Sequence, residues 1–380
     1  MGKRSRQARR AQRKRPSVGV APAVAESADA LADAPSFADL PASAAQLAAF
    51  EDACASHAGD SRPELGCVVR LDRGFPLVLT ATRCVRAEHA VSFAKQDVER
   101  RDAVFPAVGD RVVLSCPEGH EMAVVESVLP RSTSLERWRG SNRGERQVLA
   151  ANVDVVLIAA QLSDKGVSLD RVARSLVLAL DCGARPAVVL TKADRVSTSF
   201  LAGEVERVRG IVGAGCPVVA TASLAGEGLE PVRRLVPQGM SAVILGESGA
   251  GKSTLLNALL GHEAMRTGAV RERDDMGRHT TVARVMLKIP GAGAIVDAPG
   301  LRSLPLVGHE RGLARAFPEI VSASRGCRFG DCSHEGEPGC AVRALVDAGE
   351  IPSERLDVFL SLAREMRVSA QELDPDVRGR

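Results

Sequence analysis

The chain has 380 residues and a formal net charge of only +3, and its length allows for two or three domains of ~100 to 200 residues each. No apolar run approaches the ~20 residues that span a bilayer, and the charged N-terminus lacks the apolar stretch of a signal peptide. We therefore expect a cytoplasmic protein with no membrane partner. Its nine cysteines are then more typical of thiols or metal ligands than of a disulfide framework.

Residues 1–62 are predicted to be a disordered basic tail followed by a linker. Eight Lys or Arg side chains fall within the first fifteen residues, and such a block repels itself and has no apolar side chains to bury. Arms of this kind bind polyanions by releasing counterions, although a solubilising or mistranslated extension could have the same composition. Within the linker one short helix is expected near residues 43–53.

Residues 63–140 are predicted to form an OB-fold RNA-binding domain. Five short β-like runs are separated by turn formers, at 66–71, 76–82, 90–93, 111–115 and 122–128. Five strands over this length favour an OB-fold, a barrel that commonly binds oligonucleotides. Aromatic side chains are scarce, which disfavours base stacking. We expect contacts to the phosphates of structured RNA, from Arg70, Arg73, Arg83, Arg86, Arg100, Arg101 and Arg111. A basic solvated face with no partner is the alternative.

Residues 145–308 alternate between apolar strands and amphipathic helices. The pattern predicts strands at 154–160, 187–190, 217–220, 242–245 and 294–296, and helices at 168–182, 199–212, 228–235 and 253–260. Such alternation is typical of a parallel sheet with helices on both faces. Ligands bind at the carboxyl ends of the strands in these sheets.

The first binding motif in chain order follows the strand at 187–190 and consists of Thr191, Lys192, Ala193 and Asp194. The Asp194 carboxylate can accept hydrogen bonds from both N1–H and the 2-amino group of guanine, whereas adenine has no matching pair of donors. Lys192 would pack its stem across the base. An ordinary strand-to-loop boundary could also produce T-K-x-D. The motif predicts guanine binding because a phosphate loop is expected at the same sheet edge.

The phosphate loop follows the strand at 242–245 and fits G-x-x-x-x-G-K-[ST], with Gly246, Glu247, Ser248, Gly249, Ala250, Gly251, Lys252, Ser253 and Thr254. Its glycines let successive N–H groups turn inward, and the loop opens onto a helix N-terminus that favours anions. Lys252 is expected to reach the β- and γ-phosphates, and Ser253 to bind Mg²⁺.

A D-x-x-G motif, Asp297 to Gly300, follows the strand at 294–296. Asp297 would hold Mg²⁺ through water, and the Gly300 N–H would meet the γ-phosphate. The polar segment Gly277 to Thr281 precedes this motif, and either Thr280 or Thr281 should complete the Mg²⁺ shell.

The residue that activates water is less evident. Leu301 stands where many GTPases place a water-orienting Gln, and an apolar side chain cannot do that work. We hypothesise that His279 orients or activates the water, because imidazole is a suitable acid or base near neutral pH. That His279 only packs or contacts a partner is the alternative.

Residues 309–380 are predicted to be a zinc-binding and helical domain. Cys327, Cys332, His334 and Cys340 form C-x4-C-x-H-x5-C, and three thiolates with one imidazole close the tetrahedral shell of a structural Zn²⁺ site. A loop-rich segment this short needs the metal to fold; unrelated buried thiols are the alternative. Helices are expected at 341–348 and 353–367.

The base reader precedes the phosphate loop, which reverses the order of ordinary GTPases. The chain resembles the circularly permuted GTPases of the small ribosomal subunit biogenesis GTPase A (RsgA) family from about residue 65 to 370. The matching residues are Ala151 to Asp154, Gly246 to Ser253, Gly277 to Thr281, Asp297 to Gly300, Phe317-Pro318-Glu319 and the cysteine cluster. The resemblance implies an OB-fold, a circularly permuted GTPase domain and a zinc module that bind the small (30S) subunit and its 16S rRNA, with GTP hydrolysis stimulated by that particle.

One departure from the family concerns Thr191, which replaces the usual Asn of N-K-x-D and is expected to weaken the bond between base reader and phosphate loop. The preferred interpretation is a monomeric, Mg²⁺-dependent GTPase that converts GTP to GDP and phosphate as a release switch in late 30S maturation. The alternative is an RNA-binding assembly scaffold that binds GTP with little turnover. An adenine-specific ATPase or kinase is disfavoured by Asp194.

Overall fold

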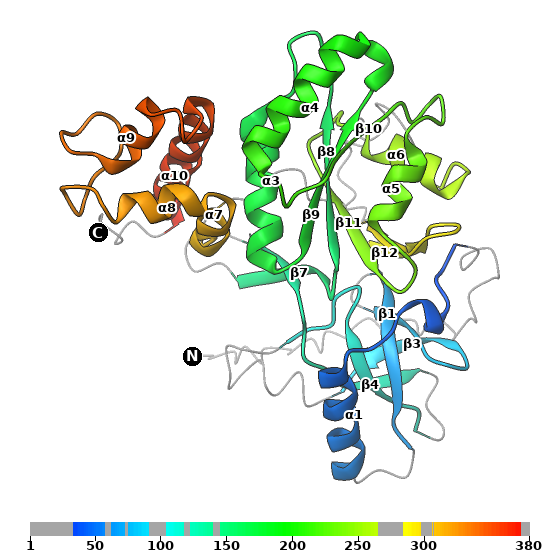
Figure 1. Cartoon of the computed structure of the whole chain (residues 1–380). Helices are drawn as coiled ribbons and strands as arrows, with labels where there is room; N and C mark the ends of the chain where they lie inside the picture. The colour runs from blue at the N-terminus through cyan, green and yellow to red at the C-terminus, as the bar shows by residue number, and fades with distance from the viewer. Residues whose placement is uncertain are drawn as a thin grey trace, which may run out of the picture.

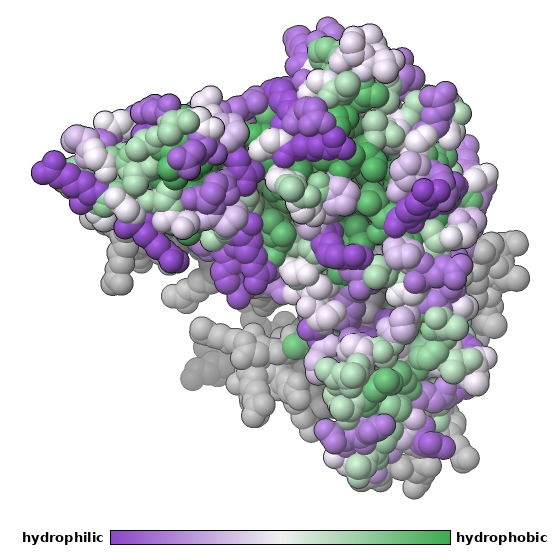
Figure 2. Space-filling view, viewed as in Figure 1, coloured by the Kyte–Doolittle hydropathy of each residue, from purple (hydrophilic) through white to green (hydrophobic). Residues whose placement is uncertain are grey.

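The computed structural model describes residues 33–57, 62–72, 75–90, 104–117, 122–139, 145–264, 284–297, 306 and 308–373. These residues form a β-barrel, a layered α/β domain and a helical C-terminal region (Figure 1). On the face shown in Figure 2, hydrophilic side chains are spread over the barrel, the α/β domain and the C-terminal region. None of the described helices is long and apolar enough to cross a membrane.

The barrel closes through β1 (Glu64–Asp72), β2 (Phe75–Leu79), β3 (Cys84–His89), β4 (Arg111–Ser115) and β5 (Ala123–Val128). Neighbouring strands pair in the order β1-β2-β3-β5-β4, and β4 pairs back with β1. The β3–β5 pair is parallel and the others are antiparallel. Side chains including Val68, Val78 and Leu114 fill the interior and are fully buried. The predicted five-stranded barrel is therefore confirmed.

The third barrel strand differs from the prediction. It was expected at 90–93, but β3 occupies Cys84–His89, and residues 91–93 lie outside the described part of the chain. Polar and apolar side chains alternate in Cys84–His89, as in a strand with one buried face. Arg86 and Glu88 make this strand less apolar than residues 90–93, which have the more strand-like composition.

The α/β domain has a parallel sheet in the order β10-β9-β8-β11-β13, with β12 antiparallel to β13. The bounds are β8 (Val155–Gln161), β9 (Arg185–Thr191), β10 (Val218–Thr221), β11 (Ser241–Leu245), β12 (Arg284–Lys288) and β13 (Ala294–Asp297). The strand that precedes the phosphate loop, β11, lies in the middle of the sheet between β8 and β13. The permuted order in the chain thus yields a compact sheet with the phosphate loop at its centre.

Helices cover both faces of this sheet, as predicted. Alternate residues of β8 point to opposite faces: Val156 and Ile158 pack in the core with α3 (Leu169–Cys182) and α4 (Thr198–Val212), whereas Val155 and Leu157 pack with α5 (Leu229–Leu235) and α6 (Lys252–Leu260). Figure 1 shows the two helix pairs on opposite sides of the sheet. Helix α3 ends at Gly183, whose φ of 88° is the left-handed conformation that glycine adopts without strain.

The barrel and the α/β domain share one continuous sheet. Strand β1 pairs antiparallel with β12, with Arg70 opposite Val285 and Leu71 opposite Arg284, which gives an 11-stranded sheet. A separate hairpin, β6 (Ser134–Arg139) and β7 (Glu145–Ala151), leads from the barrel into β8. Neither β12 nor this hairpin was predicted.

Residues 33–57, which we call the N-terminal strap, are folded. They contain a short 3-10 helix, η2 (Phe37–Asp39), and α1 (Ala44–Ser56). The short helix expected near 43–53 is thus confirmed. The prediction of tail and linker for the whole of 1–62 was wrong for this part, because polar groups of the strap bond to the barrel and to the α/β domain.

The C-terminal region is helical, with α7 (Glu310–Ala316), α8 (Pro318–Ser324), α9 (Ala341–Asp347) and α10 (Ser353–Leu373). Helices α9 and α10 match the two predicted helices, whereas α7 and α8 were not foreseen. The motif Phe317-Pro318-Glu319 joins α7 to α8: Phe317 is fully buried, Pro318 begins α8, and Glu319 pairs with Arg355 at 2.5 Å. Arg355 also donates to the carbonyl oxygens of Ala316, at 2.8 Å, and of Ile211 in α4. This buried guanidinium fastens the region to the α/β domain.

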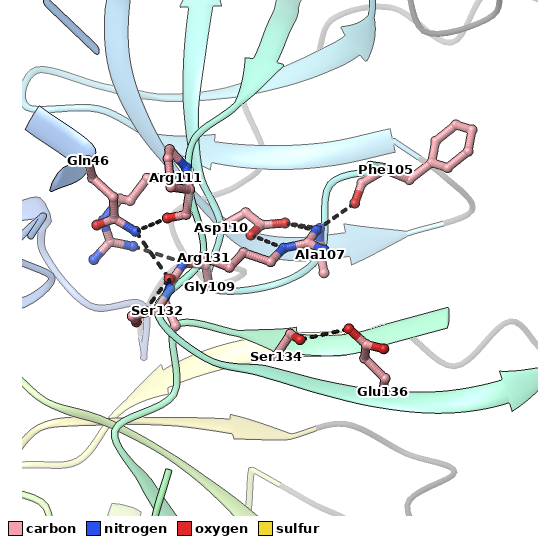
Figure 3. Close-up of polar contacts among 12 residues, drawn as sticks. Gln46, Phe105, Ala107, Gly109, Asp110, Arg111, Arg131, Ser132, Ser134 and Glu136 are labelled. Carbon is pink, nitrogen blue, oxygen red and sulfur yellow. Dashed lines mark hydrogen bonds and ion pairs between the residues drawn. The ribbon is translucent and has the colours of Figure 1, made fainter. Parts of the chain in front are cut away.

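The arginines expected to contact RNA do not all face solvent. Arg111 is 5% exposed and donates to the carbonyl oxygens of Gly109, Leu40 and Pro41, close to Gln46 in Figure 3. Its role is structural, which corrects the prediction for this residue. Arg83 pairs with Glu64, and Arg70 and Arg86 both pair with Asp72. Arg73, Arg100 and Arg101 lie outside the described residues.

Candidate functional site

The candidate nucleotide site lies at the carboxyl ends of three adjacent parallel strands. Gln161 ends β8 and is in register with Thr191, which ends β9. Leu245 ends β11, in register with Ile158 of β8, and the phosphate loop starts at the next residue. This edge is where ligands bind in open parallel sheets, so the topology brings the two predicted motifs to one place.

The phosphate loop has the backbone that its glycines permit. Gly249 and Gly251 have φ values of 80° and 79°, and a Cβ at Gly246 would lie 2.4 Å from the carbonyl oxygen of Ala159, so a side chain is excluded there. Lys252, the first residue of α6, donates from Nζ to the carbonyl oxygens of Gly246 and Glu247, both at 2.6 Å. The ammonium therefore lies over the loop, where phosphate oxygens would be stronger, charged acceptors.

The base-reader segment contacts this loop directly. Thr191 is buried, and its Oγ1 donates to the carbonyl oxygen of Ala250 at 2.8 Å. Lys192, in the left-handed conformation with φ 61°, donates from Nζ to the carbonyl oxygen of Gly249 at 2.8 Å and to Oε1 of Gln161 at 2.7 Å. The hydroxyl of Thr191 therefore makes a link of ordinary length to the loop; whether this link is weaker than that of the usual Asn stays a prediction.

Asp194 is the second residue of η3 (Ala193–Arg195), the short helix that begins directly after Lys192, and it is exposed to solvent. Partial burial and the charge of Arg195 both lower the pKa of Lys192, while Asp194 opposes this shift. The carboxylate is thus accessible beside a lysine whose ammonium is held by two oxygen atoms. That arrangement suits a planar base lying on the lysine stem with its edge toward the carboxylate.

Gln161 was missed by the sequence analysis, although it helps to hold Lys192. The available indication was its position, since it is a polar residue at the end of an otherwise apolar strand on the ligand-binding edge. The ion pair between Arg171 of α3 and Glu247 of the phosphate loop was also missed. This contact joins residues far apart in the chain, and local patterns do not encode it.

A cavity of about 680 Å³ adjoins the phosphate loop. It is lined by Gly246, Glu247 and Ser248 of the loop, by α3, and by Leu362 and Glu365 of α10. Arg174 of α3 pairs with Glu365 at 2.5 Å. The loop that is expected to bind phosphates therefore faces the C-terminal helix across this space.

Asp297 ends β13, which is parallel to β11, with Val296 opposite Val243. It therefore lies at the same sheet edge as the phosphate loop, on the side away from β8. The other residues expected in the magnesium and water sites, Thr280, Thr281, Gly300 and His279, lie outside the described part of the chain.

The cysteine cluster lies between α8 and α9. The ligand atoms of Cys327, Cys332, His334 and Cys340 are all within 4.8 Å of one another. The Sγ atoms of Cys327 and Cys340 are 4.0 Å apart and lie 3.6 and 3.5 Å from Nδ1 of His334. A tetrahedral Zn²⁺ with ordinary bond lengths requires sulfur–sulfur and sulfur–nitrogen separations of about 3.8 and about 3.5 Å, so the four residues fit this metal.

The imidazole of His334 is suited to be a metal ligand. Burial lowers the pKa of His334, against the opposing charge of Glu337, and this favours the neutral ring that binds metals. Its backbone has a φ of 62°, and its carbonyl oxygen accepts from Nε of Arg343 at 2.9 Å. The loop conformation is therefore fixed by α9, which carries Arg343.

Known proteins share this architecture. A protein from Streptomyces avermitilis, named small ribosomal subunit biogenesis GTPase RsgA, is 42% identical over 317 residues, which cover 82% of each chain. A protein of the same name from Methanosarcina acetivorans is 37% identical over 269 residues, covering 71% of this chain and 72% of its own. The crystal structure of YjeQ from Thermotoga maritima matches with a TM-score of 0.60 at 26% identity, over 80% of this chain and 98% of that one.

The fold match extends to a second solved structure. YloQ, described as a circularly permuted GTPase, has a TM-score of 0.54 at 20% identity and covers 85% of this chain and 99% of its own. The RsgA GTPase family model matches residues 128–307, which include the base reader, the phosphate loop and D-x-x-G. With the permuted sheet and the extent of the sequence matches, these findings show that the chain belongs to the RsgA GTPase family of GTP-hydrolysing enzymes.

Proposed function

We propose that this protein hydrolyses GTP to GDP and phosphate as a release switch during late maturation of the small (30S) ribosomal subunit. The proposal is supported by the relatives from S. avermitilis and M. acetivorans, whose names describe small ribosomal subunit biogenesis. The observation that carries it in this chain is the contact between Thr191 and Lys192 and the phosphate loop.

Guanine would be selected by Asp194. Its carboxylate accepts hydrogen bonds from N1–H and the 2-amino group, and Lys192 packs across the base while Gln161 and Gly249 hold its ammonium. Adenine would leave the carboxylate without partners. A site built on hydrogen bonds discriminates against such a mismatched ligand by roughly 10⁴-fold.

The triphosphate would lie on the N–H groups of Gly246 to Thr254, with Lys252 turning from the loop carbonyls to the β- and γ-phosphates. Ser253, Asp297 and either Thr280 or Thr281 are the proposed Mg²⁺ site, and the ion supplies positive charge to the phosphate oxygens. A water oxygen then bonds to the γ-phosphorus as the β–γ bridging bond breaks, and the bridging oxygen leaves on GDP. We assign His279 to orienting or deprotonating that water, and Gly300 to the γ-phosphate.

The C-terminal cluster would hold one structural Zn²⁺ through Cys327, Cys332, His334 and Cys340. Four protein ligands leave no open position, so the metal would stabilise the loop and take no part in chemistry. The position of the cluster between α8 and α9 supports this role, because Arg343 of α9 already bonds to the carbonyl oxygen of His334 in the loop.

The proposed partner is the 30S particle with its 16S rRNA, bound by a monomer in the cytoplasm. A basic tail and an OB-fold barrel are features typical of RNA-binding proteins. The alternative remains a scaffold that binds the particle and GTP but turns over slowly.

Hydrolysis of GTP with and without purified 30S particles distinguishes the two functions. The switch predicts a large increase in kcat with particles, whereas the scaffold predicts unchanged, slow turnover at saturating GTP. The His279→Ala variant should lose the stimulated turnover while retaining GTP affinity. Full stimulated turnover in that variant would remove His279 from the mechanism.

A further inference from the structure

The N-terminal strap is bonded to the barrel at several points. Arg111 of β4 donates from Nη2 to the carbonyl oxygens of Leu40 and Pro41, at 2.9 and 3.1 Å. Gln46 of α1 is buried and donates from Nε2 to the carbonyl oxygen of Pro130 and to Oδ1 of Asn152, at 3.0 and 3.1 Å. Both side chains lie near Gly109, which precedes β4: Arg111 donates to the Gly109 carbonyl oxygen, and Gln46 bonds to Asn152, which also donates to that oxygen (Figure 3). Buried polar contacts of this kind hold two elements in one arrangement.

The same strap is bonded to the α/β domain a few residues earlier. The carbonyl oxygen of Asp33 accepts from the backbone N–H of Lys288 at 2.7 Å, and Nζ of Lys288 pairs with Asp39. The carboxylate of Asp33 contacts Nε2 of His262 at 2.8 Å. The strap therefore bridges the barrel and the α/β domain independently of the chain that connects them through β7.

The two residues of the α/β domain that contact the strap, His262 and Lys288, lie at or just after the ends of consecutive described elements of the chain. His262 follows α6, the helix that begins with Lys252, and Lys288 ends β12. The chain between these elements carries Gly277 to Thr281, the residues proposed to meet Mg²⁺ and water. On its other edge β12 pairs with β1 of the barrel. The strap thus contacts the chain just after α6, where it leads into the segment that carries the proposed switch residues. It also contacts the far end of β12, the strand that follows this segment and pairs with the barrel.

We propose that the N-terminal strap couples the barrel to the nucleotide site, with Asp33 and Asp39 as positioning residues that hold His262, after α6, and Lys288, at the end of β12. The inference rests on the proposed function, in which the barrel meets RNA and the phosphate loop holds GTP. A nucleotide that shifts α6 or β12 then shifts the strap and β1, and by reciprocity a ligand on the barrel biases the nucleotide site. The side-chain contacts of Asp33 with His262 and of Asp39 with Lys288 are discrete, and substitutions can remove them.

The test uses the full-length chain and hydrogen–deuterium exchange with GDP or a non-hydrolysable GTP analogue. The variant Asp33→Ala/Asp39→Ala removes the carboxylate that contacts His262 and the carboxylate that pairs with Lys288. Because Asp39 also caps η2 through Ser36, Lys288→Met is the second variant, since it breaks the ion pair from the other side and leaves the cap intact. The matched control, Glu51→Gln/Asp52→Asn, neutralises two exposed carboxylates of α1.

In the wild type and the control, exchange of the β1 peptide at residues 64–72 should differ between the two nucleotides. Both coupling variants should bind nucleotide within about twofold of wild type and lose most of this difference, while α6 keeps its own response. Equal exchange of β1 in the two states of the wild type, or a full difference in both variants, would overturn the inference. If 30S particles did not stimulate GTP hydrolysis, the proposed function would be contradicted instead. The exchange result would still decide whether the strap couples the barrel to the nucleotide site.

Discussion

Thr191 and Ala250 are joined by a hydrogen bond of 2.8 Å, although 59 positions separate them in the chain. The bond connects the end of β9 to the middle of the phosphate loop, and Thr191 is only 2% exposed. Lys192 makes the adjacent link, to Gly249. These contacts bring the base-reader segment and the phosphate loop together at one sheet edge, although the sequence separates them.

Replacement of Thr191 by Val should lower affinity for GDP and GTP by roughly 5- to 10-fold. Valine keeps the shape and leaves the Ala250 carbonyl without its donor, which costs about 1 to 1.5 kcal/mol. Thr191→Ser keeps the hydroxyl and serves as the control, with affinity close to wild type. Titration with a fluorescent guanine nucleotide measures both. Equal affinities for the Val and Ser variants would show that the bond does not support the site.

Replacement of Cys332 by Ser should remove the zinc from the C-terminal cluster. Three remaining ligands bind the metal far more weakly, and the loop between α8 and α9 then loses its fixed conformation. Metal analysis should give about one zinc per wild-type chain and much less in the variant, with protease cleavage near residues 327–340. Cys54→Ser, at a half-buried cysteine of α1 outside the cluster, should retain the metal. A full zinc content in Cys332→Ser would contradict the assignment.

Replacement of Arg355 by Met should destabilise the junction between the C-terminal region and the α/β domain by about 2 to 4 kcal/mol, because it leaves Glu319 and two backbone carbonyl oxygens without their donor. Arg364→Met removes an ion pair with Glu335 whose side chains are 61% and 51% exposed, and should cost less than about 1 kcal/mol. Urea denaturation of the two variants gives the comparison. Similar midpoints would refute a structural role for Arg355.

Much of this architecture follows from local patterns, because the elements of the α/β domain have clear periodicity. The apolar run of β8 and the amphipathic α3 with Gly183 at its end were placed to within a residue or two. The phosphate loop and the cysteine cluster were found because their spacing reflects the geometry of a phosphate and of a metal.

The parts that were not predicted depend on contacts between distant residues. The pairing of β1 with β12 joins the edges of two domains, and edge pairing leaves no mark in either strand. Arg111 has the sequence context of an exposed RNA contact, but the strap covers it and accepts two of its hydrogen bonds. Gln161 acquires its role from Lys192, a residue on another strand.

Nucleotide preference of the Asp194→Asn variant tests the central claim most directly. Xanthine carries an oxygen where guanine carries the 2-amino group, so an asparagine amide can accept from N1–H and donate to that oxygen. Competition binding of GTP and XTP should show that the wild type prefers GTP. In the variant, the ratio of GTP affinity to XTP affinity should fall by at least about 10²-fold, so that XTP becomes the preferred nucleotide. Unchanged GTP binding in the variant would mean that the segment at 191–194 does not read the base of the nucleotide whose phosphates meet Lys252.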